Sequence, residues 1–303
     1  MKVGPIFWWR VAVSVALLGG LGYWLDGRAI LGRLVQLKLG WVAASIVLSV
    51  VQVSLSAWRW RFTATRLGLV LPLHRAIREY YLGIFINQLL PGGVVGDVSR
   101  AWRHSKTDRM GPAIKGVVLE RASGQIVMTV VALCSCLALP NEVRRTLLSA
   151  LGSAAVLVSV LAVAVVVFFQ RIRPARPLLK SWMRDIASTL LLKKALVVQL
   201  GVSLLIVSSY LAVFVMAARG LGVMTPATVL LPLVAPVLVT MLIPVTIAGW
   251  GVREGAAALL WAAVGLSASD GVAISAAYGL IVFVSSLPGA VVLIALLQAE
   301  RRP

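Results

Sequence analysis

Charged and strongly polar side chains interrupt this apolar chain in three short stretches. They read "NQLLPGGVVGDVSR" at 87–100, "GVVLERASGQIVM" at 116–128 and "GWGVREGA" at 249–256. Their carboxylate and guanidinium groups belong to Asp97, Arg100, Glu120, Arg121, Arg253 and Glu254. Ionisable groups at membrane depth pair with one another, line water-filled paths or contact polar substrates. If the chain lies in a membrane, these stretches suggest the binding of an anionic group by arginines.

The composition indicates an integral membrane protein. Of 303 residues, 60% are hydrophobic and only 13% are charged, and the mean hydropathy is +0.97. Apolar stretches recur at about 11–25, 41–58, 116–139, 150–169, 195–218, 227–248 and 272–297, with a shorter one at 254–266. Most approach the roughly 20 residues that a spanning helix needs. We predict one all-α, polytopic transmembrane domain, 1–303, with about six to eight transmembrane helices.

The basic residues indicate topology rather than nucleic-acid binding. The formal net charge is +19, but the lysines and arginines fall in short blocks between apolar stretches, as the positive-inside rule describes. We expect the richest blocks, 59–78, 98–115 and 171–194, in the cytoplasm, together with both termini. These blocks would also suit an anionic lipid surface. His74 and His104 lie in basic connections, and we expect them to face water or headgroups.

Sequence motifs for catalysis are lacking. No DxD, GxSxG or HExxH arrangement and no ATP-binding P-loop occurs. Cys134 and Cys136 fit neither a redox pair nor a zinc site, so we expect small buried side chains. We predict no catalytic residue, no metal and no cofactor.

The first polar stretch raises a topological problem. If 59–78 and 98–115 are both cytoplasmic, the chain at 79–97 must enter and leave the membrane on the same side. Pro91 would end a short entering helix, and the glycines after it would permit a tight turn. Broken backbone at membrane depth is tolerated only where protein or a water-filled cavity surrounds it. We therefore predict a re-entrant segment whose turn lines a cavity.

A second broken segment is predicted at 227–266. Pro244 stands five residues before Gly249, the spacing that is also found in the first segment. The charge blocks give the two segments opposite directions of entry, which predicts an inverted repeat with halves 41–139 and 195–297. In such repeats, broken helices converge on a site near the midplane. The alternative is that the two apolar parts of 227–266 each span the membrane.

The predicted cavity has a defined set of candidate residues. They are Asn87, Pro91, Gly92, Gly93, Gly96, Asp97, Arg100, Glu120, Arg121, Gln125, Gly249, Gly251, Arg253 and Glu254. Burying Glu120 or Arg121 alone would be costly, so both should face the interior, paired or hydrated. With Gln125 they could line the cavity, or they could form a structural ion pair that braces the broken helix. Asp97 and Arg100 could instead form a local pair on a helix surface.

The third polar stretch adds two expectations. Arg253 and Glu254 are adjacent and point to different sides of a helix, so at least one should have a partner elsewhere. Helix N-termini that follow Gly96 and Gly251 would offer free N–H groups to an anion.

Three motifs together resemble a known membrane family. "NQLLPGGVVGDVSRA", the "LER" of 119–121 and "GWGVREGA" are similar to the family that includes the flippase-like domain of lysylphosphatidylglycerol synthases, also called the multiple peptide resistance factor, and its stand-alone relatives. The family's LPGG-x-x-GD pattern maps onto Leu90, Pro91, Gly92, Gly93, Gly96 and Asp97, and its G-x-G-x-x-E-like element onto Gly249, Gly251 and Glu254. The resemblance implies a multi-pass protein of the bacterial inner membrane that is associated with lipid translocation. Because a soluble aminoacyl-transferase domain is lacking in these residues, we do not expect synthesis of lysyl-lipid.

We therefore expect a flippase-like translocator of an anionic or isoprenoid lipid. The resemblance implies phospholipid, hopanoid or polyprenyl-linked partners, and lipid-synthesis enzymes as further partners; nucleic acid is not expected. One alternative is a membrane-embedded transferase or hydrolase in which a carboxylate acts as a base or metal ligand. Another is an accessory subunit of a lipid-synthesis complex.

Overall fold

The structure, a computed structural model, describes residues 5–90, 93–105, 110–171, 176–242 and 246–300. Pro91, Gly92 and Pro244 lie outside these residues. The described part is all-α, as predicted. Its helices are α1 (Pro5–Trp24), α2 (Gly27–Val35), α3 (Leu39–Arg66), α4 (Leu73–Leu89), α5 (Val95–Ser105), α6 (Met110–Cys136), α7 (Asn141–Arg171), α8 (Arg176–Ile186), α9 (Lys193–Gly220), α10 (Ala227–Val239), α11 (Val252–Ala263), α12 (Ala268–Ser286) and α13 (Pro288–Glu300), with a π-helical turn η2 (Ala187–Leu191) and a 3-10 turn η3 (Thr240–Leu242).

Four apolar helical stretches in the described part are long enough to cross a membrane. They are α3, α6, α9 and the consecutive α12 and α13, which contain 28, 27, 28 and 32 residues in the apolar ranges. A helix of about 20 residues already covers the hydrocarbon core. These helices contain the predicted stretches 41–58, 195–218 and 272–297 and most of 116–139. The protein is therefore a multi-pass membrane protein.

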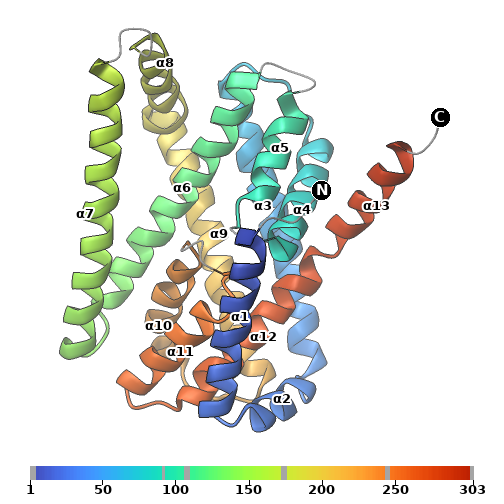
Figure 1. The fold of residues 1–303 in the computed structure, drawn as a ribbon, viewed down its shortest axis with the longest axis vertical. Coiled ribbons are helices and arrows are strands. Elements are labelled where there is room, and N and C mark those ends of the chain that lie inside the picture. Colours follow the sequence, from blue (N-terminus) through green and yellow to red (C-terminus); the bar gives the residue numbers. More distant parts are fainter. Residues whose placement is uncertain (1–4, 91–92, 106–109, 172–175, 243–245, 301–303) are drawn as a thin grey trace.

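The helices α4 and α5 form a hairpin within one half of the molecule. Figure 1 shows both in its upper half, next to the ends of α3 and α6. Their backbones approach closely where Gly83 of α4 meets Gly96 of α5, because a Cβ atom added at Gly96 would overlap the carbonyl group of Gly83. Small residues allow such approach between helices in membranes. The first polar stretch therefore forms the tip and the returning arm of this hairpin.

The helices α10 and α11 form a second hairpin, in the opposite half of the molecule (Figure 1). Its tip contains left-handed backbone at Ala248, Gly249 and Gly251, with φ values of 50°, 79° and 89°. The helix α10 has 13 residues and continues through η3 to Leu242, and α11 has 12 residues. Both are shorter than the four long apolar stretches.

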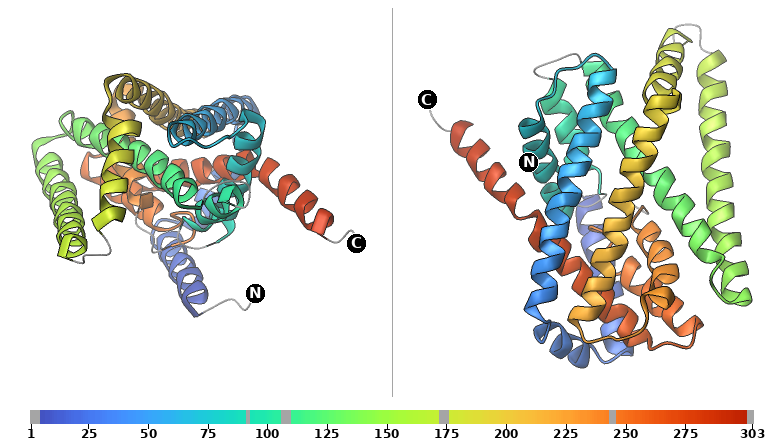
Figure 2. Two further views of the ribbon diagram at one scale, coloured as in Figure 1. Left: turned by 90° about the horizontal axis from the view of Figure 1, so that it is seen from above. Right: turned by 180° about the vertical axis from the view of Figure 1, so that it is seen from behind.

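The long helices hold each hairpin through a separate apolar core. One core, which includes Trp60 and Ala101, joins α3, α4, α5 and α6. The other, which includes Phe214, Trp261 and Tyr278, joins mainly α9, α10, α11 and α12. The helix α10 also packs on α6, and α13 packs on α4. Figure 2 shows the resulting arrangement from two further sides. The tips of the two hairpins thereby face the same region in the middle of the molecule.

The contact between Gly83 and Gly96 gives the first test. Gly96→Ala should destabilise the protein by roughly 1–3 kcal/mol or more, as overpacking does, because the new methyl group must separate α4 from α5. Gly111→Ala, on α6 with open space around its Cβ position, is the matched control and should not lower the unfolding temperature. Thermal unfolding of the purified protein in detergent measures both. Equal unfolding temperatures for the two variants would contradict the close helix approach.

Candidate functional site

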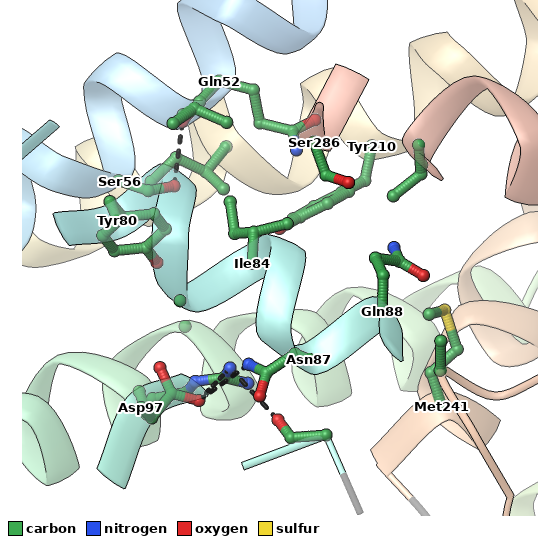
Figure 3. A pocket seen from close by; sticks show the side chains of 18 of the residues that line it. Gln52, Ser56, Tyr80, Ile84, Asn87, Gln88, Asp97, Tyr210, Met241 and Ser286 are labelled. Carbon is green, nitrogen blue, oxygen red and sulfur yellow. Dashed lines mark hydrogen bonds and ion pairs between the residues drawn. The ribbon is translucent and has the colours of Figure 1, made fainter. Parts of the chain in front are cut away.

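A cavity of about 280 Å³ lies between the tips of the two hairpins. Its walls come from α3, α4, α5, α6, α9, α10 and α12 and from both tips. Figure 3 shows Asn87 and Asp97 close together on the first hairpin, and Gln88 on the same side as Met241 of η3. The candidate residues in the lining are Asn87, Gly93, Asp97, Arg100, Glu120, Arg121, Gln125 and Gly249. Gly96, Gly251, Arg253 and Glu254 are described but lie outside the lining, and Pro91 and Gly92 are outside the described residues.

Glu120 is the centre of the charged groups on this wall. Its side chain is fully buried and pairs with two arginines. Arg59 of α3 donates to Oε1 at 2.6 Å, and Arg100 of α5 donates to Oε2 at 3.1 Å. The hydroxyl group of Tyr80, on α4, also donates to Oε1 at 3.2 Å. One carboxylate on α6 therefore links three other helices.

Asp97 extends this chain of charges to the tip of the first hairpin. Arg100 donates to its Oδ1 at 2.8 Å, and Arg121 forms an ion pair with its Oδ2. Arg121 also donates to the carbonyl group of Gly93 at 3.3 Å. The charged chain thus alternates in sign, in the order Arg59, Glu120, Arg100, Asp97, Arg121. Asp97 and Arg100 therefore form the local pair considered above, and this pair is also part of a network between helices.

Asn87 fixes the turn between α4 and α5. Its Oδ1 accepts a hydrogen bond from the N–H of Gly96 at 2.7 Å, and its Nδ2 donates to Asp97 at 3.2 Å. The side chain therefore replaces a backbone partner for the first residues of α5. The N–H of Gly96 is consequently not free for an anion.

Aromatic rings and glycines make room for the buried arginines. The guanidinium group of Arg100 lies 4.5 Å from the ring of Trp60 and 4.4 Å from that of Tyr80, measured to the centroids. Such stacking is favourable for desolvated cations. A Cβ atom added at Gly124 would lie only 2.8 and 3.0 Å from the two Nη atoms of Arg59. Gly124 of α6 is therefore needed for the position of Arg59.

A second charged cluster lies next to the cavity, at the start of α11. Glu254 is fully buried; its Oε2 accepts from the N–H of Gly251 at 2.7 Å and its Oε1 from Arg253 at 2.6 Å. The hydroxyl group of Ser275 also donates to Oε1 at 2.9 Å. Glu254 folds back as a helix cap and also meets the adjacent arginine. Because both side chains contact Ser275 of α12, the expected partner outside this pair is present. The N–H of Gly251 is likewise not free.

The sequence interpretation misplaced several side chains. Arg59, which the sequence assigns to the basic block 59–78, is only 5% exposed and belongs to the buried network of ion pairs. His104 is buried rather than solvated, with its ring edge-on to Trp60 at 5.7 Å. Cys134 is exposed, whereas only Cys136 is buried. Arg59 lies about two helical turns before the end of α3. This position within a long helix was the available indication that the side chain is buried.

Further polar groups surround Arg59 without having been predicted. Its Nη1 donates to Ser203 of α9 at 2.8 Å, and Gln199 of the same helix donates to Thr63 at 2.9 Å. A sequence does not show which way an isolated serine or glutamine in an apolar helix points. The partners of these side chains therefore become known only from the packing of α3 against α9.

Most of the chain matches the model of a known protein family. The model described as "Lysylphosphatidylglycerol synthase TM region" matches residues 8–289. The chain belongs to this family. No curated protein and no solved structure matches it. Membership in this family associates the chain with lipid modification or translocation in general, and with lipids as partners.

The buried network predicts a large effect of removing the Glu120 charge. Glu120→Gln should destabilise the protein by roughly 3–5 kcal/mol, because Arg59 and Arg100 would share a buried site with one carboxylate fewer. Arg33→Gln, which breaks the half-exposed pair with Asp270 at 2.6 Å, should cost about 1 kcal/mol or less. Thermal unfolding in detergent compares the variants.

A double variant separates charge imbalance from other damage. Arg59→Met with Glu120→Gln restores the balance of the two groups and should recover part of the loss caused by Glu120→Gln alone. If the single and double variants unfold at the same temperature, or if Arg33→Gln is as harmful as Glu120→Gln, the assigned role of the network is wrong.

Proposed function

We propose that the protein translocates a lipid with an anionic headgroup, including an isoprenoid phosphate, across its membrane through the cavity between the two hairpins. The observation that carries this proposal is the chain of alternating charges along the wall of that cavity. Ionisable groups at such depth mark substrate paths, and family membership supports a lipid as the substrate. In this proposal the side chains bind and release a headgroup, and the protein is not an enzyme.

The two hairpins are re-entrant in this proposal, and the halves 41–139 and 195–297 form an inverted repeat. The opposite positions of α4–α5 and α10–α11 support it (Figure 1). Each half also has a buried arginine next to a buried glutamate and between a tryptophan and a tyrosine. These residues are Arg100 with Glu120, Trp60 and Tyr80, and Arg253 with Glu254, Trp250 and Tyr278. Rocking of one half against the other would expose the cavity to each side in turn.

The basic connections support one orientation. The end of α3, the start of α6 and the segment between α7 and α9 contain the richest basic blocks, so we place this end in the cytoplasm of a bacterial inner membrane. Both termini are cytoplasmic in this arrangement.

Cysteine labelling tests the re-entrant hairpin. In a Cys134→Ser, Cys136→Ser background, single cysteines would replace two exposed residues, His74 in the first turn of α4 and Met110 at the start of α6. Both should react with a membrane-impermeant maleimide from the cytoplasmic side, whereas a cysteine in place of exposed Asn141 should react from the other side only. Reaction of the His74 and Met110 positions from opposite sides would show that this segment crosses the membrane.

Lipid movement in proteoliposomes tests the function. Vesicles that contain the purified protein should lose the asymmetry of fluorescent phosphatidylglycerol, or of a polyprenyl phosphate, faster than empty vesicles. Asp97→Asn should abolish this acceleration because it removes the counter-charge of Arg121, and Glu254→Gln should abolish it because it weakens the cap of α11. Arg145→Gln, an exposed position far from the cavity in sequence and fold, is the control. Movement of neither lipid, with the folded protein present, would reject translocation of these substrates.

A further inference from the structure

The charges on the cavity wall are unequal in number. Its described lining contains the basic residues Arg59, Arg100 and Arg121 and the acidic residues Asp97 and Glu120. The adjoining segments 91–92 and 243–245 contain no ionisable side chain. The wall therefore has an excess of positive charge.

Both carboxylates on this wall already have arginine partners. Each oxygen of Glu120 accepts from an arginine. Each oxygen of Asp97 likewise faces an arginine. A headgroup with a free amine would find no available carboxylate unless it broke one of these buried pairs. The arrangement disfavours a cationic headgroup.

Arg121 is the accessible cation of the network. Its side chain is 36% exposed, compared with 6% for Arg59 and 1% for Arg100. Its Nη2 contacts Asp97 and Gly93, while its Nε and Nη1 have no hydrogen-bond partner among the described residues. The planar guanidinium fork matches the oxygens of a phosphate group. Arg121 can therefore bind a phosphate that enters the cavity.

Two hydroxyl groups elsewhere on the wall lack partners. Thr246, in the tip of the second hairpin, is 2% exposed, and Ser285, near the end of α12, is 9% exposed. Neither hydroxyl group has a hydrogen-bond partner within the described part of the chain, and both residues line the cavity. Buried hydroxyl groups of proteins are normally hydrogen-bonded. Gln88 and Gln125 add amide groups to the same lining, so the wall offers uncharged partners for hydroxyl groups.

We propose that the cavity selects a phosphodiester lipid headgroup with an uncharged polyol, such as glycerol. The phosphate binds Arg121, and the polyol binds Thr246 and Ser285. The route of the lipid through the protein rests on the function proposed above, but the headgroup selectivity can be measured without transport. A cavity of about 280 Å³ accepts a headgroup of this size, while the acyl chains stay outside it.

Binding of short-chain lipids to the purified full chain tests this selectivity. The probes are dihexanoyl forms of phosphatidylglycerol, phosphatidylmethanol, phosphatidylcholine and lysylphosphatidylglycerol, with sn-glycerol 3-phosphate as the soluble source of the same chemistry. Calorimetry should give a Kd for phosphatidylglycerol at least about tenfold below those of the other lipids and of glycerol phosphate. Equal or tighter binding of phosphatidylcholine or lysylphosphatidylglycerol would overturn the charge selectivity, and equal binding of glycerol phosphate would overturn the assignment to a lipid.

Variants assign each part of the headgroup. Arg121→Gln should weaken phosphatidylglycerol roughly tenfold or more, and Arg121→Lys should restore part of the affinity, since it keeps the charge but not the fork. Thr246→Val with Ser285→Ala should remove the preference for phosphatidylglycerol over phosphatidylmethanol, which has the same charge but no polyol. Arg145→Gln should change neither Kd. A preference that survives the double substitution would overturn the polyol site.

The binding and transport experiments can fail separately. Selective binding without movement in proteoliposomes rejects translocation and keeps the headgroup site. Movement of all phospholipids at the same rate, with equal affinities, keeps translocation and rejects the headgroup site.

Discussion

The burial of Glu120 between Arg59 and Arg100 is the interaction on which the rest of the structure depends. A lone carboxylate or guanidinium group at membrane depth costs several kcal/mol, so α3, α5 and α6 must meet where these side chains lie. The helix α5 has only 11 residues, and the contact of Arg100 with Glu120 fixes it to α6. The charges therefore stabilise a broken helix that apolar packing alone would not specify.

The second hairpin also has a buried carboxylate and a buried arginine, but it pairs them in a different way. Its carboxylate, Glu254, closes the start of its own helix and keeps Arg253 as a neighbour, so its charges are satisfied mostly within α11 and by Ser275 of α12. Gly279 leaves space for the guanidinium group of Arg253, as Gly124 does for Arg59. The cluster around Glu120 lines the cavity, whereas the cluster of Arg253 and Glu254 lies outside the lining. Tyr278 connects the two, because it lines the cavity and also packs over Arg253.

The sequence predicted the membrane class, the long apolar helices and the interruptions well, because hydropathy, proline and glycine act locally. It also selected Asp97, Arg100, Glu120 and Arg121, since charges in apolar stretches are rare. The sequence alone could not show which of these charged groups form ion pairs, because partners such as Arg59 and Glu120 are 61 positions apart. Arg59 was assigned to the nearest basic block because its depth depends on where α3 ends.

The distance along the chain between Arg59 and Glu120 also affects biosynthesis. The helix α3 emerges from the ribosome with a charge whose partner, on α6, is 61 residues away. The helix must therefore enter the bilayer with an arginine whose carboxylate partner has not yet been synthesised, which is unfavourable, or remain beside the insertion machinery until α6 arrives. Since Arg100 on α5 reaches its carboxylate only when α6 is in place, the first half of the protein should assemble as one unit, with α6 as the step that commits it to the membrane.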